Sequence, residues 1–251
     1  MAGWARRTAE VAALLAASAA LVGCGDDGDG SSAGDDQTGD SAGSSAFAEQ
    51  EGAEIRDASG EAMGQLESVR VRGDITMGGD EISLDLATST AGDCTGTLTL
   101  DGAEAEVLSV GGQAWFRPSE EFWTAQAGPQ ADQVIDLVAG RWVVLGEDDG
   151  FAEFCDLDQL LDELVEDSDT ESTYETGEQS EVDGIAVVAV ESTDEDGETS
   201  TGYIAVEEPH HLVRIEKTEG EDTGTVTFTE FDEPLEVEAP ADEDMVDLDS
   251  L

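Results

Sequence analysis

Cations are scarce in this chain, which has 9 lysine and arginine residues against 62 aspartate and glutamate residues. Lys217 is its single lysine, and the formal net charge is −53 over 251 residues. Nucleic-acid binding depends on cations that neutralise phosphates, and electrostatic docking on anionic membranes depends on clustered cations. The charge therefore excludes both. Because salt screens the mutual repulsion of so many acids, the composition favours a protein adapted to a salty exterior.

Groups that carry out chemistry are scarce as well. The only histidines are His210 and His211, and adjacent residues of a strand point to opposite faces, so the two cannot bind one metal together. They follow Pro209, and we expect them at the surface near the start of a strand. The chain has no nucleophile elbow, phosphate-binding loop or dinucleotide fingerprint. We therefore expect no enzyme, no cofactor and no metal.

Two acidic stretches, 26–30 and 194–197, superficially resemble calcium loops. Neither has the spacing of a calcium-binding loop with its distal bidentate glutamate. Calcium binding is the alternative use of these acids, but the sequence favours a solvated acidic surface.

Long apolar runs are absent after the N-terminal segment. There, Arg6 and Arg7 precede an apolar run over 11–22. A helix that crosses the hydrocarbon core of a membrane needs about 20 residues, so this run is too short to span it. The run ends on Leu21-Val22-Gly23-Cys24, which resembles the bacterial lipobox. That motif implies cleavage before Cys24, a diacylglycerol on its thiol and further acylation (palmitate) of the new amino group, which together anchor the protein to the outer face of the cell membrane. The alternative is an ordinary signal peptide with Cys24 incidental.

Residues 25–50 consist mainly of glycine, serine, alanine and aspartate, and Phe47 is their first large apolar residue. Such a stretch cannot bury enough surface to order itself. We therefore divide the chain into a signal peptide (1–23), a lipidated cysteine with a disordered tether (24–52) and one folded domain (53–251).

The folded part alternates between helical and strand spacing. Residues 55–66 predict a short helix, and 69–77 with 82–86 predict a hairpin around Gly78-Gly79. Further strands are predicted at 95–100, 103–110, 113–116, 185–190, 201–206, 212–217 and 223–231. Helices are predicted at 130–139 and 156–164; 141–145 fit a strand or a helical cap, and 166–181 are polar and loop-like. This order indicates an α+β fold with one large antiparallel sheet.

Two cysteines remain besides Cys24, namely Cys94 and Cys155. An exported chain enters an oxidising compartment, so we expect them to form a disulfide that ties the early strands to the helix at 156–164. The alternative, a redox or catalytic thiol, needs an activating neighbour, and the chain has no Cys-x-x-Cys motif and no histidine nearby in sequence.

The order of these elements resembles a known family. A lipobox cysteine and a tether lead to an opening helix and Ser68-Val69-Arg70-Val71-Arg72-Gly73. A helical middle follows, and Val182-Asp183-Gly184 opens a meander that ends in Pro240-Ala241-Asp242. Over about 53–251 the chain is similar to the actinobacterial LppX/LprG-type lipoproteins, which are related in fold to LolA and LolB. The resemblance implies a large curved antiparallel sheet, a half-barrel, partly wrapped around a few short helices.

The resemblance also implies a function. Members of that family bind or carry lipid or lipoglycan acyl chains between sheet and helices, so the expected partner is a lipid or lipoglycan, and we expect a monomer. The alternative is an envelope lipoprotein that acts as a protein-interaction module with a filled core. Eight apolar residues are the predicted cavity lining, although apolar alternation by itself marks only burial: Ile75, Leu84, Leu86, Val134, Leu137, Val138, Leu160 and Leu161.

Overall fold

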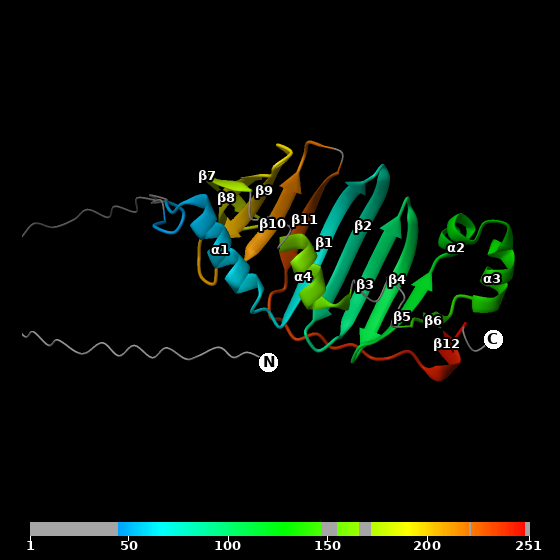
Figure 1. Ribbon diagram of the computed structural model, residues 1–251. Coiled ribbons are helices and arrows are strands. Elements are labelled where there is room, and N and C mark those ends of the chain that lie inside the picture. The colour runs from blue at the N-terminus through cyan, green and yellow to red at the C-terminus, as the bar shows by residue number, and fades with distance from the viewer. Residues whose placement is uncertain (1–44, 147–154, 166–171, 221, 249–251) are drawn as a thin grey trace, which may run out of the picture. The chain divides into compact units, whose positions relative to one another are not determined.

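The computed structural model describes residues 45–146, 155–165, 172–220 and 222–248. Their centre is one open 12-stranded sheet with the order β12-β6-β5-β4-β3-β2-β1-β11-β10-β9-β8-β7 (Figure 1). Its strands are β1 (Ser68–Met77), β2 (Asp80–Ser89), β3 (Cys94–Leu100), β4 (Ala103–Val110), β5 (Gln113–Pro118), β6 (Trp142–Val144), β7 (Thr173–Val182), β8 (Ile185–Thr193), β9 (Thr199–Ala205), β10 (Leu212–Lys217), β11 (Thr223–Thr229) and β12 (Met245–Val246).

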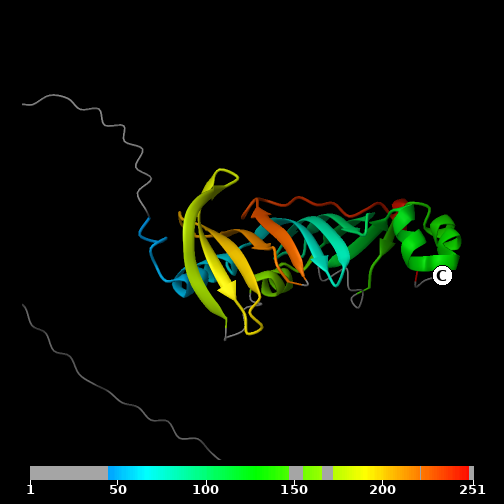
Figure 2. The same ribbon diagram turned by 90° about the horizontal axis from the view of Figure 1, so that it is seen from above.

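Neighbouring strands are antiparallel, except that β12 runs parallel to β6. Met77 pairs with Asp80 across Gly78-Gly79, and both glycines have positive φ, at 60° and 97°, as a two-residue hairpin turn requires. The register shifts in the pairs β7–β8 and β9–β10. Because such irregularities bend and twist a sheet, they account for the turn of β7–β9 away from the line of β1–β4 in Figure 2.

The helices are α1 (Gly52–Met63), α2 (Glu120–Ala127), α3 (Ala131–Val138) and α4 (Leu157–Val165), with short 3₁₀ turns η1 (Gly128–Gln130) and η3 (Asp242–Asp244). In Figure 1, α1 and α4 lie on one face of the sheet, here called the inner face, whereas α2 and α3 lie at its end beyond β5. No helix in the described ranges is long and apolar enough to cross a membrane.

The main core lies on the inner face. Val69, Val71, Leu86, Val188 and Phe228 are at most 1% exposed and pack with Ile55 and Met63 of α1 and Leu157 of α4. Alternate residues point outward, where Val187 and Val213 form a smaller cluster with Val182. The large open antiparallel sheet and its few short helices confirm the α+β class and the curved sheet inferred from the sequence.

Two local predictions were wrong. Residues 166–181 were predicted to be loop-like, but 173–182 form the edge strand β7. This strand pairs with β8 and contacts α1 through Tyr174, and most of its side chains are exposed, so it lacks apolar alternation. The histidines, predicted to be surface residues, are half-buried: His210 stacks on Phe47 with centroids 3.6 Å apart, and His211 stacks on Phe231 at 4.2 Å. Burial lowers the pKa of His211.

The folded region also begins earlier than the sequence suggested. Phe47 and Ala48, which we assigned to the tether, are 9% and 7% exposed and belong to the main core. A single phenylalanine in a polar stretch gives no periodic signal, and its burial depends on the distant His210 ring.

Candidate ligand pocket

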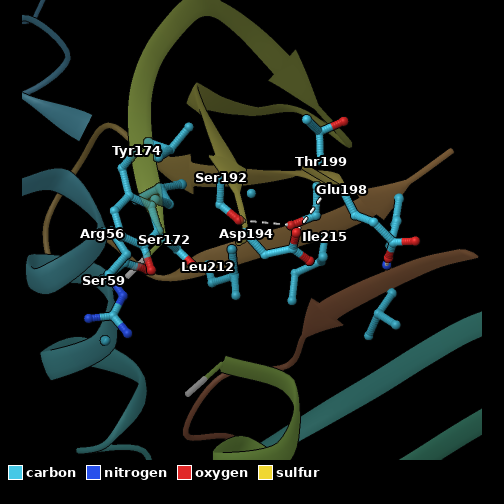
Figure 3. Close-up of a pocket in the computed structure, with 17 residues that line it drawn as sticks. Arg56, Ser59, Ser172, Tyr174, Ser192, Asp194, Glu198, Thr199, Leu212 and Ile215 are labelled. Atoms are coloured by element: carbon cyan, nitrogen blue, oxygen red, sulfur yellow. Dashed lines mark hydrogen bonds and ion pairs between the residues drawn. The ribbon is translucent and has the colours of Figure 1, made fainter. Parts of the chain in front are cut away.

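A pocket of about 320 Å³ lies between α1 and the inner face of β7–β11 (Figure 3). Its floor is apolar and comes from four neighbouring strands: Val190 of β8, Ile204 of β9, Leu212 and Ile215 of β10, and Val226 of β11. Four of these residues are at most 6% exposed, namely Val190, Ile204, Leu212 and Val226. The floor is therefore continuous with the main core. Such a floor suits a hydrocarbon chain.

The wall on α1 is formed by Arg56, Ser59 and Gly60, and the last two of these are small. Gly60 lines the pocket, and a Cβ added there would meet no atom within 4 Å. Ser59 beside it is 4% exposed, and its Oγ has no hydrogen-bond partner among the described residues. Buried hydroxyls are usually hydrogen-bonded, and a helical serine ordinarily bonds the carbonyl four residues earlier. The wall therefore offers an unused hydrogen-bonding group beside open space.

The charged residues of the rim are paired. Lys217 Nζ donates to Glu198, and this hydrogen bond raises the pKa of Lys217. Arg56 is 3.1 Å from the carboxylate of Asp57, and its guanidinium lies 5.5 Å from the centre of the Tyr174 ring. The rim thus carries charges of both signs in contact with each other.

The turn at 194–198, one of the two acidic stretches considered for calcium, has another use. Asp194 Oδ1 accepts hydrogen bonds from the backbone N–H groups of Asp196 (3.0 Å) and Glu198 (2.9 Å). This is the local geometry of an Asx turn. Among the described residues no group of three or more histidine, cysteine, aspartate or glutamate residues is arranged to hold a metal. The other stretch, 26–30, lies outside the described residues, as does Cys24.

The eight residues predicted to line a cavity lie elsewhere, five of them in or against the main core and three on α3. Leu84, Leu86, Leu160 and Leu161 are buried in the main core, and Ile75 packs against it. Val138 belongs to a separate cluster with Val143 and Val246, Val134 packs against that cluster, and Leu137 is 44% exposed. The structure therefore divides the eight into two groups, and none of them lines the pocket beneath α1.

The sequence contained a signal for Ser59 that its apolar pattern did not reveal. Ile55, Ala62 and Met63 mark the buried stripe of α1, and Ser59 falls in the same stripe, one turn after Ile55. A serine on a buried stripe next to a glycine indicates a place where a polar atom and free space meet. Apolar periodicity alone could not show it.

Cys94 and Cys155 form a disulfide in the structure, with their Cα atoms 5.3 Å apart. It joins β3 to the segment that enters α4, and Thr88 Oγ1 of β2 donates to the carbonyl of Cys155 at 3.1 Å. In Figure 1, α4 lies in front of the inner face of the sheet, and its Leu157, Leu160 and Leu161 belong to the main core. The disulfide thus fixes the start of α4 against the sheet, and the first pocket lies elsewhere, beneath α1.

A second pocket, of about 440 Å³, adjoins the disulfide. It is lined mainly by polar residues and backbone, among them Ser89, Ser109 and Asp156. Ser109 Oγ already donates to Gly92, and the Asp156 carboxylate caps α4 through the N–H of Gln159. The hydroxyl of Ser109 and the carboxylate of Asp156 are thus engaged, and the pocket beneath α1, which has an apolar floor, is the better site for a hydrocarbon chain.

No protein-family model matches the chain, and no curated protein matches it. Among solved structures, LprF from Mycobacterium bovis matches with a TM-score of 0.53 at 17% identity, over 75% of this chain and 96% of LprF. The lipoprotein LppX from Mycobacterium tuberculosis matches at 18% identity, over 74% of this chain and 97% of LppX, with a TM-score of 0.48. The chain therefore has the fold of the LppX/LprG-type lipoproteins that its sequence resembles.

Proposed function

We propose that the protein is a membrane-anchored extracytoplasmic lipoprotein that binds a lipid acyl chain in the pocket beneath α1. One observation carries the proposal: an apolar floor shared by β8–β11 faces a helix wall that leaves open space at Gly60. The place of the pocket supports it, because the pocket lies between α1 and the inner face of the sheet, in a fold that the chain shares with LprF.

The volume bounds what the pocket holds. Ligand pockets generally measure about 300–1,000 Å³. At about 320 Å³ this one is near the lower limit. It suits one acyl chain or part of one, and a lipid with several chains would leave the others outside.

Cys24 supplies the anchor in this proposal. Acylation there, after removal of 1–23, holds the chain at the outer face of the membrane, and the residues that follow carry the pocket away from the surface. Phe47 is the first residue of the described part that packs into the core. The ligand thus reaches a site tethered near its membrane source.

A plug tests the proposal. In the chain with Cys24→Ser, which removes the acylation site and leaves the described residues unchanged, Gly60→Leu places a side chain in the open space beside the floor. We expect calorimetric binding of 1-decanoylglycerol, a lipid with one short chain, and its loss in Gly60→Leu. Glu61→Leu is the matched control, because it adds the same side chain at an exposed position of the same helix.

Two results would contradict the proposal. One is equal binding by the plugged and control variants, which would place the ligand elsewhere. The other is the absence of binding to the unplugged protein, together with a native mass spectrum of the purified chain that shows no bound lipid. That second result would favour the alternative, a protein-interaction module.

A further inference from the structure

We propose that Ser59 determines the specificity of this pocket and that the ligand is an uncharged acyl ester, whose carbonyl oxygen accepts a hydrogen bond from Ser59 Oγ. The inference rests on the proposed function, the binding of an acyl chain. It adds the chemical class of the ligand's polar end and the residue that recognises it.

Within the described ranges, Ser59 is the pocket residue whose side-chain oxygen is buried and lacks a hydrogen-bond partner. Among the described residues, buried side-chain atoms without a hydrogen bond occur at Ser59, Trp123 and Arg214, and of these only Ser59 lines the pocket. Ser192 and Ser200 also line it, but their hydroxyls are 3.2 Å apart and bond each other. A hydroxyl donates one proton, so a carbonyl oxygen of the ligand satisfies it.

The charges of the rim argue against an anionic ligand. The cations that line the pocket are Arg56 and Lys217, and each is already paired with a carboxylate, Asp57 and Glu198 respectively. Asp194 adds a further carboxylate to the same rim, in a chain of net charge −53. A fatty-acid carboxylate or an anionic headgroup would have to displace one of these pairs and enter a negative field.

The pocket in Figure 3 has an apolar floor and a wall on α1 with a hydroxyl, and each suits one end of the proposed ligand. The hydrocarbon chain lies on the floor formed by Val190, Ile204 and Leu212, and the ester reaches the wall on α1, where Ser59 lies. Gly60 next to it leaves space for the group beyond the ester. An ester links a hydrocarbon chain to an uncharged polar group. It therefore matches a site with an apolar floor and a hydroxyl on its wall.

Three ligands with the same chain length separate these features: 1-decanoylglycerol, its ether 1-decylglycerol, which lacks the carbonyl, and decanoate. With the Cys24→Ser chain in a calorimeter, we expect the ester to bind about tenfold more tightly than the ether, the ratio for one neutral hydrogen bond. We expect decanoate to bind at least tenfold more weakly than the ester at pH 7. Ser59→Ala should weaken ester binding about tenfold and leave ether binding unchanged.

Ser180→Ala is the matched control, because it removes an exposed hydroxyl of β7 that does not line the pocket; it should preserve the ratio of ester to ether. Equal ester binding by Ser59→Ala and the parent, or decanoate binding as tight as that of the ester, would overturn this inference while the acyl-chain proposal stands. If none of the three ligands binds, the proposed function fails, and the inference fails with it.

Discussion

In this acidic protein, arginines form ion pairs and hydrogen bonds that link neighbouring parts of the fold. Arg70 and Arg72 both bind the carboxylate of Asp85, at 2.7 and 3.1 Å, and both lie near Glu230. Arg117 pairs with Glu106 and stacks over Trp142, while Arg214 pairs with Asp183 and Glu216. Arg141 instead donates to the carbonyls of Leu137, Val138 and Met245, which caps α3 and holds β12. In the described ranges, these arginines are therefore engaged in contacts that stabilise the fold.

Asp85 provides a pH test of this role. The hydrogen bond from Arg70 is the main cause that lowers the pKa of Asp85, so its charged form stabilises the folded state. This contribution is complete above the ordinary pKa and is lost as the pH falls through the lower folded value. We expect Asp85→Asn to reduce the free energy of unfolding by about 0.2–1 kcal/mol at pH 7, as for a partly exposed pair. The difference from the parent should shrink in urea titrations at pH 3; an equal difference at both pH values would contradict the linkage.

Ser59 gives a second prediction, on stability without ligand. Burying a hydroxyl without a partner destabilises a protein, and Ser59→Ala, which replaces the hydroxyl by a hydrogen atom, removes that cost. We expect Ser59→Ala to raise the free energy of unfolding of the empty protein by about 1 kcal/mol, within the 1–3 kcal/mol that such groups cost. Urea denaturation of lipid-free protein measures it. A destabilised variant would show that the hydroxyl is satisfied in the empty protein.

Elements whose side chains alternate could be predicted from the sequence. Strands β1 and β2 have one buried face, and α4 has leucines at helical spacing, so each was found within a few residues of its bounds. The edge strand β7 and the helix α2 were missed. Phe122 is the buried residue of α2, which is too few to give a period, while the side chain of Ser119 caps its start by accepting from Phe122.

The disulfide links two elements of the fold, and we predict how much stability is lost when it is removed. It closes a loop with a sequence separation of 61 residues between β3 and the start of α4. The chain-entropy relation gives about 4 kcal/mol for a loop of this length. We expect Cys94→Ser with Cys155→Ser to lose about that much in guanidinium unfolding. Thr88→Val, which removes only the hydrogen bond to Cys155, is the control and should lose about 1 kcal/mol. Equal losses in the two variants would mean that the covalent link contributes little.

The location of free space depends on the whole molecule and could not be predicted from apolar periodicity. Leu160 and Leu86 have the same pattern of burial that a cavity lining would have, yet α4 fills the sheet at that point. Under α1, Ser59 and Gly60 replace the large side chains that would fill the corresponding space. Which helix fills its share of the inner face is decided by long-range packing, and local spacing does not encode it.

The net charge of −53 leads to a prediction for the entire chain. Electrostatic screening extends over about 30 Å at 0.01 M salt and about 3 Å at 1 M, so added salt relieves the repulsion among acids. We expect Tm to rise continuously from 0.01 to 1 M NaCl, by about 2–4 °C for each kcal/mol of repulsion relieved.

Calcium chloride at matched ionic strength is the control that separates screening from ion binding. Screening alone predicts the same Tm in both salts, because it depends on ionic strength. The described residues hold no cluster suited to a metal, so no additional rise at millimolar calcium is expected from them. A Tm that stays constant or falls as NaCl increases would contradict adaptation to a salty exterior. It would also mean that the short-range pairs, such as Arg70 with Asp85, outweigh the repulsion, since salt weakens those pairs while it relieves the rest.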